Sequence, residues 1–117
     1  MKTIVIGGRE VPMLRNALSP VIYRRIFHKD SLAQMNNIEK SEEPSGDVID
    51  LYGEIAFVMA MQAAKQLGEL KLITESDYYN WLNQFEDPYA ILKALDEIVS
   101  YYNEQELSTS TAKKEEG

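Results

Sequence analysis

Apolar residues recur along the chain in patterns that predict a short β-hairpin followed by helices. Residues 3–6 are Thr-Ile-Val-Ile, and the segment from Arg9 to Met13 can return beside them. Gly7 and Gly8 lie between the two segments and supply the positive φ angles that a two-residue hairpin turn needs. A lone hairpin is marginally stable in water, so we expect this one to pack on helices or to pair with another chain's sheet edge.

Helical periodicity follows the hairpin. Ser19 is a typical N-cap and Pro20 suits the first helical position, so we expect a helix to start there. This helix should end near His28 and Lys29. Its apolar face consists of Val21, Ile22, Ile26 and Phe27.

The middle of the chain predicts two helices separated by a loop. Asp30 can cap a short helix from Ser31 to about Asn37, and the charged stretch 39–46, which contains Pro and Gly, predicts an exposed loop. The longest apolar segment, residues 47–67, has two apolar stripes, so we expect a central helix that is covered on most of its circumference. Gly53 within it predicts a close helix crossing or a frayed first turn. The stripes are Val48, Leu51, Tyr52, Ile55, Met59 and Gln62, and Ala56, Ala60, Ala63 and Leu67.

Two further helices and a tail complete the predicted fold. Gly68 is a candidate C-cap, Thr74–Asp77 resembles a capping box, and Asp87–Pro88 can open the last helix. Residues 108–117 offer nothing to bury and predict a disordered tail. We therefore expect a mainly α-helical (α+β) fold: one domain over residues 1–107, with a hairpin at 3–13, four to five helices and a flexible tail. The apolar positions of the two helices are Tyr78, Tyr79, Trp81, Leu82 and Phe85, then Ile91, Leu92, Leu95, Ile98, Val99 and Tyr102.

Composition excludes several classes of function. The chain has 117 residues with 12 Lys and Arg against 19 Asp and Glu, a net charge of −7, which argues against nucleic acid as the main partner. It contains no cysteine and a single histidine, so a disulfide framework, a thiolate site and a multi-histidine metal centre are excluded within one chain. No apolar run approaches the roughly 20 residues of a membrane span, and the apolar opening is too short for a signal peptide.

Candidate catalytic groups are sparse, and we expect no enzymatic activity, cofactor or metal. His28 is the only imidazole, and its place at a helix C-terminus favours a capping or surface role. The many carboxylates lack calcium-loop spacing, and Gly7-Gly8 lacks the lysine of a phosphate loop. The basic residues from Arg24 to Lys29, with Arg15, predict a solvated helix face or a salt-bridge patch between subunits, which could meet the acidic stretch 39–50 of another copy.

Aromatic residues are concentrated in the last third of the chain. Core packing accounts for Trp81 and Phe85, whereas the tyrosines exceed what one small core absorbs. Because exposed tyrosine is favoured at interfaces, these residues predict a protein-binding face. The candidate client-binding residues are Tyr78, Tyr79, Trp81, Tyr89, Tyr101 and Tyr102.

The order of several segments resembles the tail assembly chaperones of long-tailed phages and prophages of Gram-positive bacteria. Phe57-Val58-Met59-Ala60 in the central helix is followed by Trp81-Leu82-Asn83-Gln84-Phe85, by the helix from Pro88 and by a terminal stretch from Ser108 to Lys114. The hairpin from Ile4 to Val11 and the segment Ser19-Pro20-Val21-Ile22-Tyr23 are similar to the family's opening. The resemblance covers nearly the whole chain except the loop 39–46.

The resemblance implies a non-enzymatic assembly factor in the host bacterial cytoplasm that is absent from the mature virion. Such chaperones bind the tape measure protein, keep it soluble and help to recruit the tail tube protein. Many occur as a short product and a longer frameshifted one, and Lys113 and Lys114 are the candidate frameshift position here. The alternatives are a small structural connector that stays in the phage particle and an acidic regulator of a host protein.

The two features without an evident role, the hairpin and the tyrosines, suggest how such a factor is organised. We expect copies to associate through the hairpin edge and the first helix, which leaves the tyrosine-rich region for the client. Replacing Tyr78 and Tyr79 with Ala should then weaken client rescue without unfolding the domain. The candidate self-association residues are Ile4, Val5, Ile6, Val21, Ile22, Ile26 and Phe27.

Overall fold

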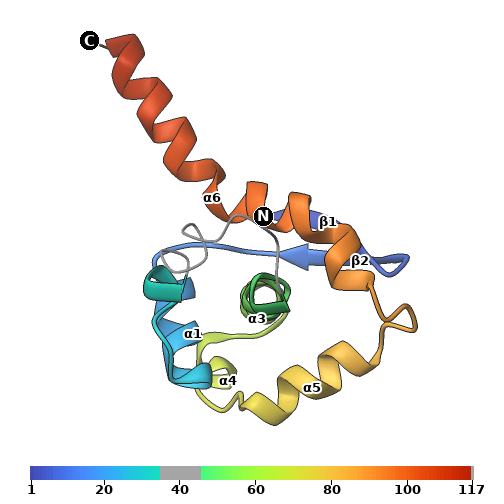
Figure 1. Cartoon of the computed structure of the whole chain (residues 1–117). Coiled ribbons are helices and arrows are strands. Elements are labelled where there is room, and N and C mark those ends of the chain that lie inside the picture. Colours follow the sequence, from blue (N-terminus) through green and yellow to red (C-terminus); the bar gives the residue numbers. More distant parts are fainter. Residues whose placement is uncertain (35–45, 117) are drawn as a thin grey trace.

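The protein consists of an N-terminal β-hairpin and a set of helices that surround one central helix (Figure 1). The computed structural model describes residues 1–34 and 46–116, with side chains described through Asn103. The predicted fold class is confirmed. The elements are β1 (Lys2–Ile6), β2 (Arg9–Met13), α1 (Leu18–Phe27), α3 (Gly46–Ala64), α4 (Leu67–Leu70), α5 (Glu75–Asn83) and α6 (Ala90–Glu116), with a further helical turn over residues 31–34.

The hairpin closes within the chain through the predicted glycine turn. β1 and β2 pair antiparallel with Ile6 opposite Arg9, so Gly7 and Gly8 alone form the loop. Their φ angles are +57° and +80°, a region that glycine adopts without steric cost. Alternate residues face the core, as the period of a strand requires. The buried hairpin residues are Ile4, Ile6, Val11 and Met13.

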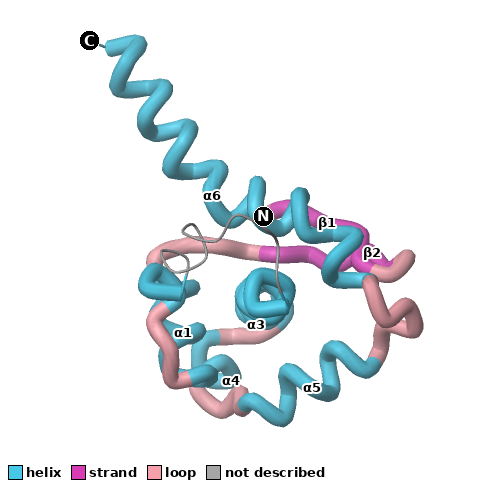
Figure 2. Tube along the Cα trace, in the orientation of Figure 1, coloured by secondary structure: helices cyan, strands magenta, loops and turns pink. Residues whose placement is uncertain are grey.

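Helix α3 is the centre of the fold, as its two apolar stripes predict. Figures 1 and 2 show it nearly end-on, with the hairpin and α6 on one side, α1 beside it, and α4 and α5 on the other side. Residues 51–60 are all buried, so the helix is enclosed on its whole circumference along this stretch. A helix in this environment must be apolar all round, which explains its low amphipathicity.

The end of α3 differs from the prediction. The helix ends at Ala64, and Gln66 is the N-cap of the short helix α4, in a capping box with Glu69. The prediction of Gly68 as a C-cap is therefore wrong, because Gly68 lies inside α4. The pattern concealed this break because the apolar period continues across it, and only the side-chain hydrogen bonds of the capping box reveal it.

The start of α1 also differs from the prediction. The helix begins at Leu18 rather than Pro20, and the Asn16 Oδ1 accepts a hydrogen bond from the Leu18 N–H at 2.9 Å. The predicted N-cap, Ser19, is buried within the first turn and donates its hydroxyl to the Gln62 Oε1 of α3 at 2.5 Å. A tertiary hydrogen bond has thus replaced the local cap. The predicted end is confirmed, since His28 terminates the helix with a left-handed φ of 58°.

Predictions for the segment between α1 and α3 are tested only in part. Asp30 caps the turn at 31–34 by accepting the Leu32 N–H at 2.9 Å, as expected. The remainder of that predicted helix and residues 39–45 of the predicted loop lie outside the described residues. Gly46, which was assigned to the loop, is the first residue of α3.

Helix α6 is longer than predicted. It starts after Asp87–Pro88, where the Asp87 Oδ1 accepts the Tyr89 N–H at 2.8 Å, and it continues to Glu116. Residues 108–116, predicted to be a disordered tail, are thus helical, and this end projects away from the rest of the molecule (Figure 1). The reason is that neither Pro nor Gly interrupts residues 90–116, and an existing helix gains one hydrogen bond for each residue added.

Some of the basic residues around α1 make contacts within the chain, while Arg24, Arg25 and Lys29 stay exposed, in agreement with the predicted solvated helix face. The Arg15 guanidinium lies over the Tyr101 ring, with its Cζ 4.5 Å from the ring centroid, and donates to the Tyr101 carbonyl. Arg25 donates to the Leu70 carbonyl at 2.5 Å, which joins α1 to α4. These contacts connect segments that are far apart in sequence, which a local charge pattern does not show.

A buried carboxylate joins α1 to α3. Glu54 is 8% exposed, and its Oε1 accepts a hydrogen bond from the Tyr23 hydroxyl at 2.7 Å. Lys29 Nζ lies 3.3 Å from the same oxygen. Burial, and then the hydrogen bond to Glu54, raises the pKa of Tyr23 well above its ordinary value. Because both partners compensate the carboxylate, removal of either would leave a buried charge poorly satisfied.

Gly53 permits the closest contact between α3 and α5. A Cβ at this position would lie 2.7 Å from the Tyr78 hydroxyl oxygen and 3.6 Å from a methyl group of Ile91 in α6. The predicted close approach at Gly53 is therefore confirmed, and the neighbours are α5 and α6.

We expect Gly53→Ala to lower the free energy of unfolding by roughly 1–3 kcal/mol, because the added methyl displaces the buried Tyr78 ring. Gly68→Ala is the matched control, since a Cβ there meets nothing within 4 Å. In the control, helix propensity alone should act and stabilise by up to about 1 kcal/mol. Urea unfolding of both variants measures the difference. Equal stabilities for the two variants would contradict the proposed packing role of Gly53.

Candidate protein-binding groove

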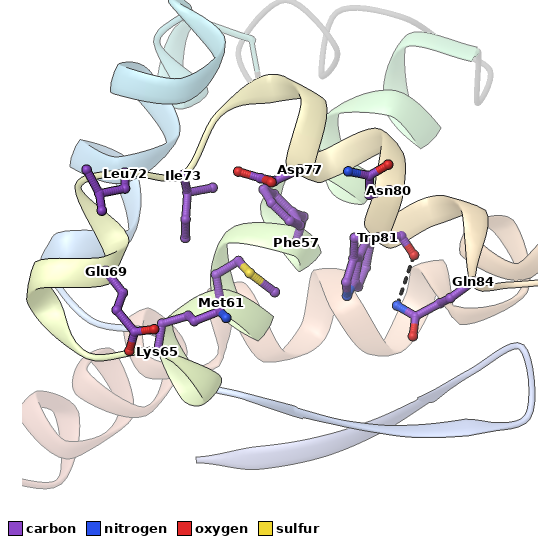
Figure 3. A pocket seen from close by; sticks show the side chains of 10 residues that line it. All are labelled: Phe57, Met61, Lys65, Glu69, Leu72, Ile73, Asp77, Asn80, Trp81 and Gln84. Atoms are coloured by element: carbon purple, nitrogen blue, oxygen red, sulfur yellow. Dashed lines mark hydrogen bonds between the residues drawn. The ribbon is translucent and has the colours of Figure 1, made fainter.

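A hollow with an apolar floor lies on the surface between α3, α4 and α5. Figure 3 shows its lining side chains, and its volume is about 520 Å³. We call it the α3–α5 groove. Its lining residues are Phe57, Met61 and Lys65 from α3, Glu69 from α4, Leu72 and Ile73 from the following turn, and Asp77, Asn80, Trp81 and Gln84 from α5 and its end.

A second hollow continues the groove toward the hairpin. Its volume is about 270 Å³, and it shares Met61, Trp81 and Gln84 with the first hollow. Beyond these shared residues it reaches Val11 and Pro12 of β2. The two hollows therefore form one elongated depression along the C-terminal half of α3.

Closely packed aromatic rings of the core lie directly beneath the groove. The Phe57 and Trp81 rings lie 5.7 Å apart between centroids, and Trp81 makes an edge contact with Phe85 at 5.1 Å. Tyr78 contacts Phe57 on the other side at 5.4 Å. Because these rings also fill the core, their orientation is fixed by packing and does not depend on a bound partner.

The polar rim of the groove is built by the local sequence. Asp77 Oδ2 accepts the Thr74 N–H at 2.8 Å in the predicted capping box, which is confirmed. Glu69 similarly accepts the Gln66 N–H at 3.1 Å, and the Gln84 Nε2 donates to the Trp81 carbonyl at 2.9 Å (Figure 3). Capping residues thus supply rim groups of fixed position around an apolar floor, an arrangement typical of protein interfaces.

The groove combines an apolar floor with charged and amide side chains. Its floor carries only aromatic, aliphatic and thioether groups, and its charged groups belong to the rim. Across the described part of the chain, no group of three or more His, Asp or Glu side chains is arranged to hold a metal ion. No helix within the described ranges is long and apolar enough to cross a membrane. An apolar floor of this kind gains free energy by covering apolar side chains of a partner.

The structure separates the six candidate client-binding aromatics. Tyr78, Trp81 and Tyr101 are buried, Tyr102 is half-buried, and only Tyr79 and Tyr89 are exposed, each at 63%. The inference that the tyrosines exceed the capacity of the core is therefore confirmed for Tyr79 and Tyr89 and wrong for Tyr78 and Tyr101. Burial raises the pKa of Tyr78 and of Tyr102, in agreement with their enclosed positions.

The candidate self-association residues are divided in the same way. Ile4, Ile6, Ile22, Ile26 and Phe27 belong to the core, whereas Val5 and Val21 are 54% and 47% exposed. The hairpin is thus covered on one face by this chain's own helices. Val21 and Ile22 line a small apolar recess of about 280 Å³ between α1 and α4. The side chains of Lys113 and Lys114, the candidate frameshift position, lie outside those described.

Sequence reasoning missed most of the groove. Met61 falls outside both predicted stripes of the central helix, and Leu72 and Ile73 lie in a turn that was given no role. Leu72 is 78% exposed, an unusual environment for leucine beside other apolar groups. The signal in the sequence was the group of apolar residues Leu70, Leu72 and Ile73, interrupted only by Lys71, directly before the capping box at Thr74.

No family model, curated protein or solved structure matches this chain.

We expect Tyr78→Ala to destabilise the protein by about 3–5 kcal/mol, because it removes a buried ring that contacts α1, α3 and Trp81. Tyr79→Ala, at the adjacent and exposed position, should change stability by no more than about 0.5 kcal/mol. Thermal and urea unfolding of the pair measure this contrast. A mild effect of Tyr78→Ala would mean that the ring is not in the core.

Proposed function

We propose that this chain is a non-enzymatic binding protein, a phage tail assembly chaperone that holds apolar segments of the tape measure protein in the α3–α5 groove. The observation that carries the proposal is the elongated groove, with its aromatic floor and its rim of charged and amide side chains. The sequence resemblance to tail assembly chaperones supports the choice of client.

The shape of the groove favours a helical client. An amphipathic helix lays its apolar side chains into such a depression at intervals of three and four residues. Met61 at the junction of the two hollows adapts to different side chains, because the thioether is flexible and polarisable. The rim carries a positive charge at Lys65 and a negative charge at Asp77. It therefore does not repel an acidic or a basic client segment along its whole length. These properties suit a factor that binds successive, differing segments of one long client.

The net charge of −7 supports the same role. A protein that keeps an aggregation-prone client dispersed benefits from a charged exterior, because complexes of like charge repel one another. A longer frameshifted product would extend from beyond Lys114, at the end of α6 that projects away from the body and the groove (Figure 1). Short and long products would therefore present the same groove, and the extension would remain available to recruit the tail tube protein.

Leu72→Asp tests the groove directly. Leu72 is exposed in the free chain, so its replacement should leave folding intact while placing a charge on the apolar contact surface. We expect the affinity for the tape measure protein to fall by about tenfold or more, since burial of one leucine contributes roughly 1.5–3 kcal/mol. The measurement is the soluble fraction of the tape measure protein from the same genome when it is co-expressed with each variant.

Val21→Asp is the matched control, because it introduces the same charge in the recess between α1 and α4. It should leave the client soluble. Loss of solubility with Val21→Asp but not with Leu72→Asp would place the client on the other recess and contradict the groove. Insoluble client with the unaltered chain would contradict the chaperone function itself.

Two mass measurements distinguish a chaperone from a connector that stays in the particle. We expect mass spectrometry of purified virions to find this chain absent. Expression of the native gene with its downstream DNA and an N-terminal tag should yield a second, longer product that shares residues up to about Lys114. Stoichiometric presence in virions would instead support the connector.

A further inference from the structure

The two edges of the hairpin are not equivalent. Ile6 and Arg9 flank a two-residue loop and therefore exchange both of their hydrogen bonds. Hydrogen-bonded and non-hydrogen-bonded pairs alternate along an antiparallel ladder, so Val5–Glu10 and Thr3–Pro12 are non-hydrogen-bonded pairs. The backbone N–H and C=O groups of these residues therefore point to the outer edges of the sheet. Each strand thus presents two residues outward.

The outer edge of β2 is closed. Pro12 has no N–H to offer, and proline is typical of edges that are protected from further pairing. Leu14, which follows β2, donates its N–H to the Met59 carbonyl of α3 at 3.0 Å. The end of β2 is therefore attached to α3, and along β2 only Glu10 offers an outward N–H.

The outer edge of β1 is open. The N–H and C=O groups of Thr3 and Val5 point to this edge, and the hydrogen bonds among described residues include none to them. The Val5 side chain is 54% exposed. A row of unsatisfied backbone groups on a strand rich in β-branched residues is a template for another strand.

We propose that the edge of β1 pairs antiparallel with β1 of a second copy of this chain and so forms a four-stranded sheet across a two-fold axis. With Ile4 opposite Ile4, Thr3 of each copy lies opposite Val5 of the other. In this register Thr3 of one copy and Val5 of the other form hydrogen-bonded pairs. The outward N–H and C=O groups of each copy therefore bond to those of the other. This register also keeps the core face of each hairpin on the same side of the sheet.

Charge complementarity at the ends of the strand supports a second copy as the occupant. The register places Lys2 of the second copy opposite Ile6, on the face toward α6. A cavity of about 600 Å³ lies beside Val5, between the Gly7–Gly8 turn and the start of α6, and its charged lining residues are Glu86, Asp87 and Lys93. Asp87 is paired with Lys93 at 2.7 Å, whereas no described residue forms an ion pair with Glu86. The carboxylate left for the second copy's Lys2 is therefore that of Glu86, and the cavity beside it has room for the lysine side chain.

Sedimentation of the full chain between roughly 5 and 500 µM tests the proposal. We expect a dimer that Val5→Pro weakens by at least about tenfold, because proline removes an outward donor without removing a bond within the hairpin. Circular dichroism and thermal unfolding show whether the variant is folded. A wild-type monomer at every concentration, or a dimer unaffected by a folded Val5→Pro variant, would overturn the proposal.

Exchanging the charges of Lys2 and Glu86 tests the register of β1 against β1 of the second copy, because both substitutions are at the surface and leave the core unchanged. Lys2→Glu and Glu86→Lys should each weaken the dimer by roughly two- to fivefold at low salt. The two together should restore it, because the opposite charges then meet again across the interface. Glu75→Lys, a charge reversal at an exposed position at the start of α5, is the control and should have no effect. If the double variant loses as much dimer affinity as the two single variants lose in sum, the antiparallel β1 register is wrong.

Discussion

The architecture depends on the burial of α3 around its whole circumference. This helix contacts β2, α1, α4, α5 and α6, and the other elements meet one another mainly around it. A single enclosed helix needs a partner on every side, and five elements from both halves of the chain cover it. The close approach of Tyr78 at Gly53 shows how tight this cover is, because a single methyl group has no room there. Within the described residues, every closely packed pair of helices includes α3.

Polar groups within this core determine how the covering elements are placed. Glu54 draws Tyr23 and Lys29 to one side of α3, and Gln62 accepts from Ser19 and donates to Asn16 near its other end. Apolar packing alone would tolerate a shift of α1 along α3, whereas buried hydrogen bonds are lost when their partners slide apart. The two contacts together therefore fix the register of α1, and through Arg25 also the position of α4.

The groove arises from the shortness of the covering elements. Helix α4 is a single turn and α5 comprises only residues 75–83, so together they cover α3 incompletely near Met61. The rings of Phe57 and Trp81 close the core at this point and also form the outer floor. The same residues thus provide core stability and surface chemistry. A substitution that removes the apolar floor would therefore also destabilise the fold. This coupling is compatible with a preformed binding surface that needs little rearrangement.

The sequence by itself determined the features whose cause is local. The Gly7-Gly8 turn requires positive φ angles, the Thr74–Asp77 box satisfies its own backbone groups, and the uninterrupted apolar character of α3 requires enclosure. Only the tertiary structure decided which apolar residues remain outside. Tyr78 and Tyr79 are neighbours of the same type in one helix, yet the first is 7% exposed and the second 63%. A helical period states that two faces differ, but it does not state which face another element will cover, because that depends on residues far away in the chain.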